Sequence, residues 1–498
     1  MQNFFKLYYD YTRSTEPPAN YHAWCGISAI SALLGKKCFI PQGKFTTFPN
    51  TYVVLVGAPA MRKSTAMNVA KRLVRACGKV PLSPESATRE SLIDDMARSR
   101  VEWNLNGKDI SYWQSSAFVT ELEQFIGGKH INDAMVKFLT AIWDEPFFKE
   151  RTRKGGEVII HNPYFTMLAC CTTSWMNDKL QADVISDGFT RRTIFVFESD
   201  INCLNPWPIN TPEEEALVEP LTKEALRIFN IGGQFNLTPQ AREKYDALYM
   251  NQRKMAEKHS HQLEHYFSSR HILIQKISMC LSAACRSDKI IDSRIIELAN
   301  VFLLETEKNL DRLFAGVGRN ELAPVAARIL DILAKRGSLT ATQIFSDLTF
   351  ADINSVELDL ILDTLVASGN LSRDHYQSAS EHPVEYALVK KPEKQESVNL
   401  LELASRLEAS SETLSAETAS FVQLPEVAPE TARLLSRQEE KKVDSAQGLL
   451  LRGKSPKPLG NQEVLSALGL GLSANGKIEA VRSQTQSSLP GLEQAQSG

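Results

Sequence analysis

Residues 52–75 have the sequence YVVLVGAPAMRKSTAMNVAKRLVR, and this stretch decides the fold. Its start, Tyr52–Val56, is apolar and mostly β-branched, which is typical of a short strand covered on both faces. Gly57 then opens a turn, and the apolar residues after Lys63 recur at helical spacing. A strand, a tight loop and a helix in this order predict a phosphate-binding loop, because the free N–H groups at the start of the helix face a polyphosphate.

In this loop we expect Lys63 to neutralise the outer phosphates of a nucleotide and the Ser64 hydroxyl to bind Mg²⁺. One residue departs from the usual pattern, because Arg62 stands where a glycine normally precedes the lysine. The reduced pattern arises by chance roughly once in a few chains of this length, so the prediction depends on the strand before it and the helix after it. The residues expected to contact ATP are Gly57, Ala60, Arg62, Lys63, Ser64 and Thr65.

The composition is that of an ordinary globular protein, and 498 residues are enough for two or three domains. No apolar run approaches the roughly 20 residues that span a bilayer. The first residues, MQNFFKLYYDYT, lack the basic start and apolar centre of a signal peptide, and the cysteines lack metal-binding spacing. These features predict a cytoplasmic protein with no membrane partner. The net charge of −3 confines any nucleic-acid surface to a local patch or channel.

Changes in composition and periodicity divide the chain into five segments. Alternating strands and helices after residue 50 predict an α/β fold with a parallel sheet. Farther on, three short helices and a β-hairpin indicate a winged helix, although a generic small α+β domain has the same pattern. The predicted segments are an N-terminal helical segment (1–50), a P-loop ATPase core (51–205), a helical lid (206–318), a winged-helix domain (319–391) and a disordered tail (392–498).

The tail prediction rests on the loss of aromatic residues. After about residue 392 the only aromatic side chain is Phe421. Such a segment buries too little apolar surface to offset the entropy of ordering it. Short amphipathic pieces within it, such as NLLELASRLEA (399–409), can fold on the surface of a partner protein. The alternative is a solvated tail whose leucines have no partner.

A nucleotide-hydrolysing site also needs a carboxylate that holds Mg²⁺ or orients the attacking water. The best candidate is Glu121, at the end of an apolar strand. Thr120 occupies the position that usually holds the aspartate of an Asp-Glu pair, so Thr120 or a water would lie at the metal. Glu123 and Asp144 are the alternative carboxylates, and each of these acids can also be a surface residue without function.

A basic hairpin is expected in FFKERTRKGGEVIIHNP (147–163). Positive side chains surround the Gly155-Gly156 turn, and a β-branched strand follows. These side chains can follow the phosphate backbone of single-stranded DNA, while a solvated loop is the alternative. The predicted DNA-binding residues are Lys149, Arg151, Arg153 and Lys154.

Two further features complete the predicted active site. A strand over residues 164–171 ends in Thr172 and Thr173, where a polar side chain can contact the γ-phosphate or the attacking water. The segment SDGFTRRTIFVFE (186–198) then places Arg191 and Arg192 at the start of a buried strand. Arginines there suit an arginine finger that completes the site of a neighbouring subunit in a ring or filament. The alternative is an arginine that only caps an internal carboxylate.

Together these residues resemble a family of phage and prophage P-loop proteins of the primase- or helicase-like kind. The resemblance covers roughly residues 15–315 and lies in PPANYHAWCGISAISALLGKK, PNTYVVLVGAPAMRKST, WDEPF, TRKGG, NPYFTMLACCTTS and DGFTRR. The order of loop, acidic strand, basic hairpin, polar strand tip, arginine, helical lid and winged helix is also similar to AAA+ ring helicases, such as the MCM and third-superfamily helicases. In those proteins the hairpin lines a central channel and holds single-stranded DNA.

The resemblance implies an ATP-dependent DNA helicase or translocase in phage or mobile-element replication, with ATP and Mg²⁺ as cofactors. It also implies a homo-oligomer, expected to be a hexamer, and the tail is a candidate site for a replication partner. Two alternatives remain open: an AAA+ helicase loader or replication initiator that does not unwind DNA, and a nucleotide-binding scaffold. The implied roles are water-orienting base for Glu121, γ-phosphate sensor for Thr172 or Thr173, arginine finger for Arg192 and lid arginine over the nucleotide for Arg270.

Overall fold

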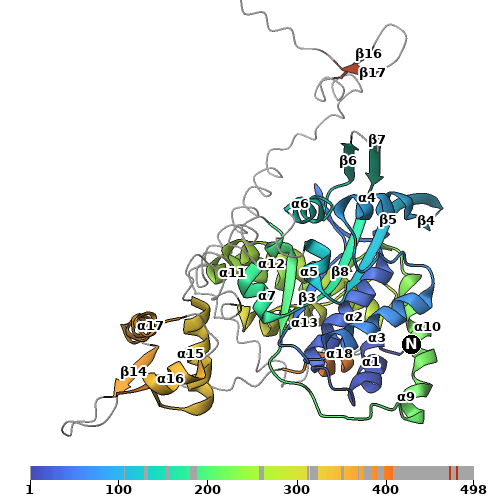
Figure 1. Ribbon diagram of the computed structural model, residues 1–498. Coiled ribbons are helices and arrows are strands. Elements are labelled where there is room, and N and C mark those ends of the chain that lie inside the picture. Colours follow the sequence, from blue (N-terminus) through green and yellow to red (C-terminus); the bar gives the residue numbers. More distant parts are fainter. Residues whose placement is uncertain are drawn as a thin grey trace, which may run out of the picture. The chain divides into compact units, whose positions relative to one another are not determined.

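A five-stranded β-sheet forms the centre of the protein in the computed structural model (Figure 1). The strands lie in the order β4-β5-β8-β3-β9, and all neighbouring pairs are parallel except β4 and β5. This arrangement confirms the predicted α/β class. The strands are β3 (Tyr52–Val56), β4 (Arg100–Leu105), β5 (Lys108–Val119), β8 (Pro163–Cys171) and β9 (Thr193–Phe197).

The chain divides into two compact units, Met1–Val422 and Gln423–Gly498. The second unit contains a short antiparallel pair of strands, β16 (Leu470–Leu472) and β17 (Ile478–Ala480). The structure describes residues 2–105, 107–127, 133–152, 156–179, 188–256, 263–310, 313, 323–348, 353–367, 370–374, 384–389, 398–407, 470–472 and 478–480.

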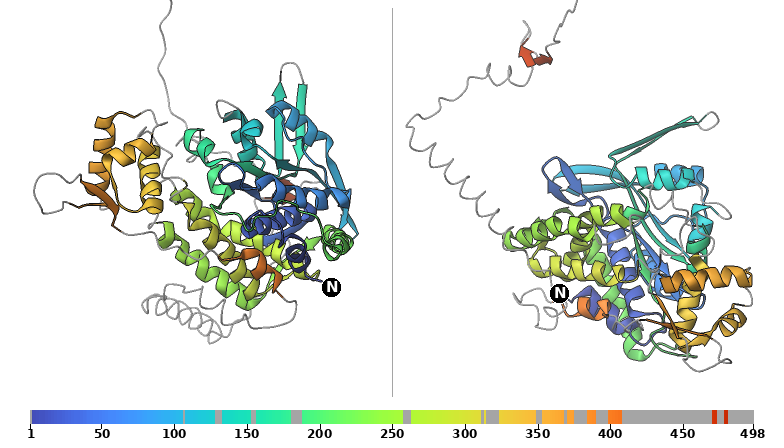
Figure 2. Two further views of the ribbon diagram at one scale, coloured as in Figure 1. Left: turned by 60° about the horizontal axis from the view of Figure 1, so that its bottom comes forward. Right: turned by 90° about the vertical axis from the view of Figure 1, so that its left-hand side faces the viewer.

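Burial explains why the central strands form where the sequence predicts them. Every side chain of β3 and of β8 is buried, as expected for strands that are covered on both faces. Helix α2 (Ala19–Leu34) packs against both strands, while α3 (Lys63–Cys77) and α5 (Leu122–Ile126) pack against β8. Since α2 is itself buried along almost its whole length, it belongs to the interior of the protein (Figure 2).

The pairing register shows which strand ends meet. Val56 pairs with Cys171 on one side and with Phe197 on the other, so β3, β8 and β9 end together. On β5, Val119 is level with Ala169, close to the same end. We call this side of the sheet the carboxyl edge and the opposite side the amino edge. Ligands of open α/β sheets bind outside the carboxyl ends of the strands, so the loop after β3 lies where a ligand is expected.

Smaller sheets join distant parts of the chain. Strand β1 lies between β2 and β10, and β11 pairs with β12. Strands β6 and β7 form an antiparallel hairpin that projects beyond the central sheet (Figures 1 and 2). The bounds are β1 (Cys38–Gln42), β2 (Phe45–Thr47), β6 (Phe147–Thr152), β7 (Gly156–His161), β10 (Gly233–Gln234), β11 (Asn236–Leu237) and β12 (Ile290–Ile291).

The helices that follow the sheet share its core. Helix α10 packs against α2 and α3, and α12 packs against α2. No helix in the described part of the chain is long and apolar enough to cross a membrane. The bounds are α1 (Phe4–Thr12), α4 (Arg89–Arg98), α6 (Asp133–Ala141), α7 (Thr173–Lys179), the 3₁₀ helix η1 (Thr190–Arg192), α9 (Pro212–Ala216), α10 (Val218–Phe229), α11 (Pro239–Ala256), α12 (Glu264–Cys285) and α13 (Ser293–Glu307).

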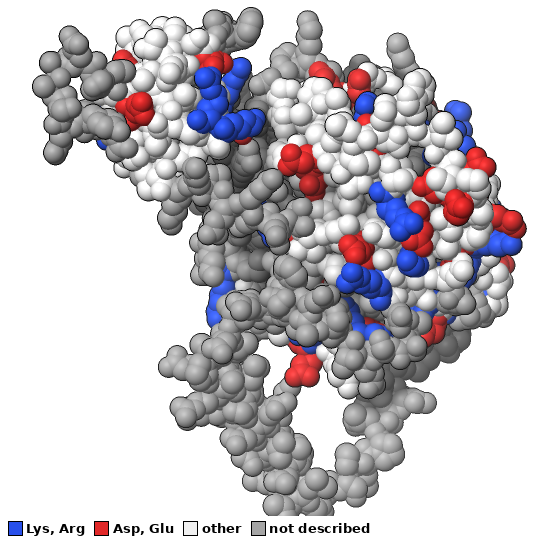
Figure 3. All heavy atoms as spheres, turned by 90° about the horizontal axis from the view of Figure 1, so that it is seen from below, with Lys and Arg blue, Asp and Glu red and all other residues white. Residues whose placement is uncertain are grey.

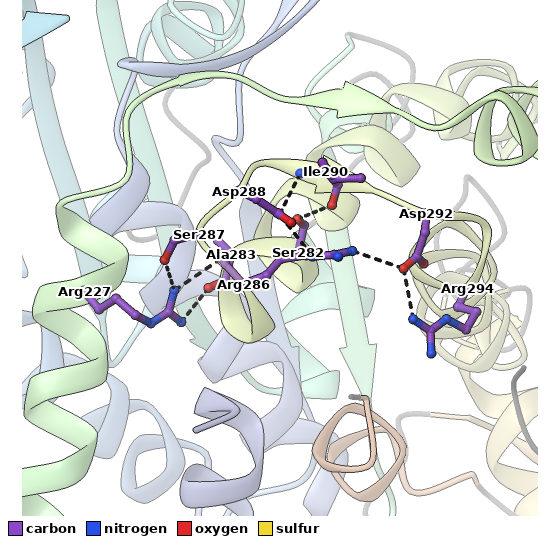
Figure 4. Close-up of polar contacts among 9 residues, drawn as sticks. All are labelled: Arg227, Ser282, Ala283, Arg286, Ser287, Asp288, Ile290, Asp292 and Arg294. Carbon is purple, nitrogen blue, oxygen red and sulfur yellow. Dashed lines mark hydrogen bonds and ion pairs between the residues drawn. The ribbon is translucent and has the colours of Figure 1, made fainter. Parts of the chain in front are cut away.

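Arg227 of α10 fixes the end of α12 (Figure 4). Its guanidinium donates to the carbonyl oxygen of Ala283 at 2.8 Å and to Ser287 Oγ at 3.0 Å. A cation at the end of a helix satisfies free carbonyl groups and opposes the negative end of the helix dipole. The contact therefore ties α12 to the helix that packs on α2 and α3.

Residues 323–389 contain the three helices and the β-hairpin that were predicted for the segment 319–391, together with a short strand between the first two helices that was not predicted. Three helices combine with a three-stranded antiparallel sheet in the order β13-β15-β14. One apolar core, which includes Ile329, Ile344 and Leu362, holds these elements together. The bounds are α15 (Ala323–Arg336), β13 (Leu339–Thr340), α16 (Ala341–Asp347), α17 (Ser355–Ala367), β14 (Leu371–Asp374) and β15 (Glu385–Leu388).

One part of the predicted disordered tail is folded. Helix α18 (Leu400–Ser405) packs against α1, α2 and α13, and Leu401 is only 1% exposed. Asn3 donates from Nδ2 to the carbonyl oxygen of Ala404 at 3.0 Å, at the end of α18. The prediction of disorder from residue 392 is therefore wrong for residues 398–407, because this amphipathic piece has its partner surface within the chain itself.

Candidate active site

The loop between β3 and α3 holds two residues in the left-handed region, since φ is 69° at Ala60 and 54° at Arg62. Arg62 is also the N-cap residue of α3, and no side chain caps this helix. Within the described part of the chain, the N–H groups of Lys63 and Ser64 have no acceptor. Free N–H groups at the start of a 15-residue helix attract an anion.

Gly57 stands where the loop leaves no room for a side chain. A Cβ atom there would lie 2.5 Å from Tyr21 Oη and 3.1 Å from the carbonyl oxygen of Glu198. Tyr21 is itself fixed, because its hydroxyl donates to Val56 O at 2.6 Å. Close packing therefore requires glycine at the start of the loop.

Lys63 points back into the loop. Its Nζ donates to the carbonyl oxygens of Gly57 and Ala58, each at 2.8 Å. Partial burial lowers the pKa of Lys63, and the nearby thiols of Cys170 and Cys171 oppose this shift. A hydrogen bond between two charged groups is stronger than one to a neutral carbonyl. A phosphate at the loop can therefore replace these two carbonyl oxygens as the hydrogen-bond partner of the Lys63 ammonium group.

Arg62 occupies the usual glycine position in a conformation that side chains disfavour. The left-handed conformation costs a non-glycine residue about 1–2 kcal/mol. The Nε of Arg62 donates to Glu16 Oε2 at 2.6 Å, with half of the Arg62 side chain exposed. Exposed ion pairs contribute about 0–1 kcal/mol, so this pair can offset much of the strain.

The tip of β8 lies beside the loop, as the sequence predicted. The Gly57 N–H donates to the carbonyl oxygen of Cys171 at 3.3 Å. Thr172 accepts the Trp175 N–H on Oγ1 at 3.3 Å, and Thr173 is the first residue of α7. Both threonines are partly exposed and directly follow the strand that pairs with β3.

Two of the predicted acidic residues, Glu121 and Glu123, lie on the same edge. Strand β8 separates β5 from β3, which places β5 about 10 Å from the strand that carries the loop. Glu121 comes two residues after Val119, is exposed, and accepts a hydrogen bond from Gln124 Nε2. Burial raises the pKa of the Cys171 thiol to about 12, and the charges of Lys63 and Glu123 both act on this thiol. The structure thus brings a carboxylate, the loop lysine and the strand tip to one edge.

Thr120 is held by another acid. Its Oγ1 donates to Glu85 Oε2 at 3.2 Å, and the other oxygen of Glu85 pairs with Lys71 of α3. The hydrogen bond from Lys71 lowers the pKa of Glu85. Glu85 is therefore an additional ionised carboxylate close to Thr120, and the sequence did not single it out.

Asp144 lies at the amino edge, away from the loop. It follows Trp143, whose carbonyl oxygen accepts from Asn50, just before β3. Its Oδ1 is 3.9 Å from Nζ of the buried Lys276. Asp144 therefore does not serve the loop of its own chain, and its prediction as an alternative carboxylate there is wrong.

Arg192 also lies at the amino edge, because Thr193 at the start of β9 pairs with Tyr52 at the start of β3. Its Nη1 donates to Gly188 O at 2.9 Å, and Nε is buried without a partner among the described residues. Burial, and then the charge of Arg191, lower the pKa of Arg192. Arg191 is the more exposed of the two arginines.

Arg270 does not lie over the loop. It is 2% exposed, and Nε donates to Glu307 Oε1 at 2.6 Å while Nη1 donates to Asn300 Oδ1 at 2.7 Å. Tyr266 also donates to Glu307, at 3.1 Å. Breaking a buried pair of this kind costs about 3–5 kcal/mol. The prediction of a lid arginine is therefore wrong, because Arg270 holds α12 against α13.

The predicted basic hairpin forms, but its charge is partly offset. Lys149 of β6 pairs with Glu157 of β7 at 2.9 Å. Glu150 forms an ion pair with Arg89 of α4, which fastens the hairpin to that helix. Arg151 is exposed on the same strand. The other two predicted DNA-binding residues, Arg153 and Lys154, lie outside the described residues.

The face shown in Figure 3 gives no second candidate for a DNA surface among the described residues. On the face shown in Figure 3, positive and negative side chains of the described residues alternate without an extended area of one sign. This pattern agrees with the net charge of −3. A nucleic-acid surface would therefore be local, as expected for a hairpin tip.

Three polar residues near the loop were not predicted: Glu16, Asn20 and Glu198. Asn20 donates from Nδ2 to Glu198 Oε1 at 2.8 Å and accepts the Leu400 N–H on Oδ1 at 3.0 Å. Burial raises the pKa of Glu198 to about 7. No spacing in the sequence links these positions with the loop, since the fold alone brings them together.

A Mg²⁺ ion would find few protein ligands at this edge. Among the residues that the structure describes, no three His, Cys, Asp or Glu side chains gather to hold a metal ion. Mg²⁺ bound together with a nucleotide usually takes one or two side chains, phosphate oxygens and water. The exposed Ser64 at the start of α3 fits such a ligand set.

Neither the protein-family models nor the curated proteins compared with this chain match it. The interpretation of the site therefore rests on its own geometry.

Proposed function

We propose that the protein is a Mg²⁺-dependent ATPase with an AAA+-like P-loop. The observation that carries this proposal is the loop after β3, which combines an uncapped helix start, a glycine without room for a side chain and the Lys63 ammonium group. Thr172, Thr173 and the acidic end of β5 border the same edge of the sheet. Phosphate binding, a γ-phosphate contact and a water-orienting carboxylate are the parts that hydrolysis of ATP needs.

Each residue has a distinct task in this proposal. Lys63 and the N–H groups at the start of α3 bind the phosphates and offset their charge. Ser64 would hold Mg²⁺, which when bound would neutralise charge that develops on the phosphate oxygens. Glu121 orients the attacking water and takes up its proton, while Thr172 or Thr173 donates a hydrogen bond to the γ-phosphate.

We further propose that hydrolysis drives a helicase or translocase on single-stranded DNA, in phage or mobile-element replication in the host cytoplasm. The β6–β7 hairpin supports this proposal, because it projects from the sheet and carries the exposed Arg151. The order of elements in residues 323–389 is typical of a winged helix. The position of Arg192 at the amino edge suits a finger that acts on the next subunit of a ring, which we infer to be a hexamer.

The alternative is a helicase loader or replication initiator that binds DNA without unwinding it. The ion pair of Lys149 with Glu157 favours this reading, because it leaves the described part of the hairpin with little net positive charge. A low affinity for DNA suits a loader better than a translocase. In either case, the chain beyond residue 407 is a candidate site for a replication partner.

The experiment that tests the proposal is an ATPase assay with and without single-stranded DNA, together with a mass measurement of the assembly. A translocase hydrolyses ATP in the presence of Mg²⁺, is stimulated by the DNA and assembles with nucleotide. Hydrolysis without stimulation or unwinding moves the assignment to a loader. Absence of both binding and hydrolysis would refute the ATPase proposal.

A further inference from the structure

The residue before Lys63 is an arginine with a left-handed backbone. At Arg62 φ is 54° and ψ is 26°, and the same residue begins α3 as its N-cap. The direction of the next N–H groups, at Lys63 and Ser64, depends on this conformation because they follow it directly. Glycine adopts the left-handed region without cost, and arginine does not.

The partner of Arg62 is a carboxylate that other parts of the chain hold in place. Glu16 accepts Arg62 Nε on Oε2 at 2.6 Å, and accepts the N–H of Asn205 on Oε1 at 3.2 Å. The N–H of Asn202 donates to the backbone carbonyl of Glu16 at 2.9 Å. The Glu16 side chain is 16% exposed, so it is far less free to move than an ordinary surface acid.

A second loop residue offers a natural comparison. Ala60 also has a positive φ, of 69°. Its methyl side chain cannot form an ion pair. Any effect of Glu16 through an ion pair must therefore depend on Arg62 and not on Ala60. A change to glycine relieves backbone strain at both positions, so Ala60→Gly is a control for that relief.

We propose that Glu16 is a positioning residue for the phosphate loop, because its carboxylate holds Arg62 in the backbone conformation that glycine would adopt unaided. The proposal rests on the nucleotide binding proposed above. Glu16 itself does not contact the phosphates. It acts through Arg62 on the N–H groups of Lys63 and Ser64, which bind them. Arg62 can replace glycine in this chain because an acid from a distant segment compensates for the replacement.

The test is a double-mutant cycle in the full-length protein, with the dissociation constant of mant-ATP measured in the presence of Mg²⁺. The variants are Glu16→Gln, Arg62→Gly and Ala60→Gly alone, and Glu16→Gln combined with each of the two glycine changes. Glutamine keeps the shape of the side chain and an oxygen for the Asn205 N–H, so the fold is preserved. We expect Glu16→Gln alone to raise Kd about fivefold, which corresponds to about 1 kcal/mol.

The two glycine backgrounds decide whether the effect passes through Arg62. With Arg62→Gly as the reference, adding Glu16→Gln should change Kd less than twofold. With Ala60→Gly as the reference, the same addition should keep its roughly fivefold effect. An equal effect of Glu16→Gln on Kd in all backgrounds, or no effect in any of them, overturns the positioning role of Glu16. The ATPase assignment is still supported in that case, because the protein binds mant-ATP.

Hydrogen exchange separates this proposal from the proposed function. Glu16→Gln should speed exchange of the amides of Thr65 and Ala66, whose N–H groups donate to the carbonyl oxygen of Arg62 at 3.0 and 3.3 Å, and should not do so when Arg62→Gly is present. If the unchanged protein binds no mant-ATP, the nucleotide-binding assignment fails. Unchanged exchange at these amides would then overturn the positioning role as well, and faster exchange would support it.

Discussion

Removing a buried leucine of α18 should destabilise the main unit of the protein, although the composition of this region predicts disorder. Leu400 and Leu401 are 0% and 1% exposed, and the helix packs against α1, α2 and α13. Truncation of a buried leucine to alanine costs about 2–5 kcal/mol. That is a large share of the roughly 5–15 kcal/mol that stabilises a typical domain. We therefore expect Leu401→Ala to lower the free energy of unfolding by at least about 2 kcal/mol.

The assay is urea denaturation followed by tryptophan fluorescence. Trp24 lies in α2, one of the helices that contact α18, and its indole N–H donates to Thr306 Oγ1 at 2.9 Å. A matched control is Leu360→Ala, the same change at a helical leucine that is 58% exposed. The control should shift the free energy of unfolding by less than about 0.5 kcal/mol.

A comparison of two shortened chains tests whether α18 stabilises the protein without creating a cavity in the core. A chain that ends at residue 408 keeps α18, whereas one that ends at residue 397 lacks it. The longer chain should keep the urea midpoint of the full protein, and the shorter one should unfold at lower urea. Equal midpoints for both chains, together with a silent Leu401→Ala, would show that α18 does not dock in solution.

Four further predictions address the site. Lys63→Ala should abolish ATP hydrolysis, while Glu121→Gln should keep ATP binding and slow hydrolysis on the order of a hundredfold; normal turnover of Glu121→Gln would exclude that residue as the base. Arg192→Ala should bind ATP and hydrolyse it poorly, and mixing it with Lys63→Ala subunits should restore some activity if the arginine acts on a neighbour. Arg151→Ala should weaken binding of single-stranded DNA and reduce the log–log salt slope by about 0.7 for each phosphate group that the side chain neutralises; an unchanged slope would remove this side chain from the DNA surface. Finally, burial raises the pKa of Glu198 from 4.5 to about 7, so the unfolded chain loses this proton first. Stability should therefore fall as pH rises from about 4.5 to about 7, and denaturation at several pH values should show a smaller fall for Glu198→Gln.

The sequence predicted those parts of the fold whose signal is local. The run Tyr52–Val56 is apolar at every position, and the structure shows it as a strand buried on both faces. The pairing of β3 with β8 then places Thr172 beside the loop, as was predicted for the tip of that strand. In each case a few neighbouring residues carry the information, because strand burial and loop geometry follow from short patterns.

The missed features depend on contacts between residues far apart in the sequence. The leucines around residue 400 indicate an amphipathic helix but not the surface that it covers, and that surface includes Asn3. The family resemblance implied that Arg270 lies over the nucleotide, and a lone arginine in a helix gives no sign in the sequence of a partner such as Glu307. Glu16 and Arg62 are likewise joined only by the fold.

The two edges of the sheet set a condition on the proposed mechanism. The loop follows the end of β3, whereas Arg192 stands level with its beginning, and the strand has five residues between them. At about 3.3 Å per residue this separation is about 16 Å, which is more than an arginine side chain spans. If Arg192 takes part in hydrolysis, it must therefore act on a nucleotide held by another copy of the chain. A strictly monomeric protein that hydrolyses ATP at full rate would exclude Arg192 from the reaction and leave it as a support for Gly188.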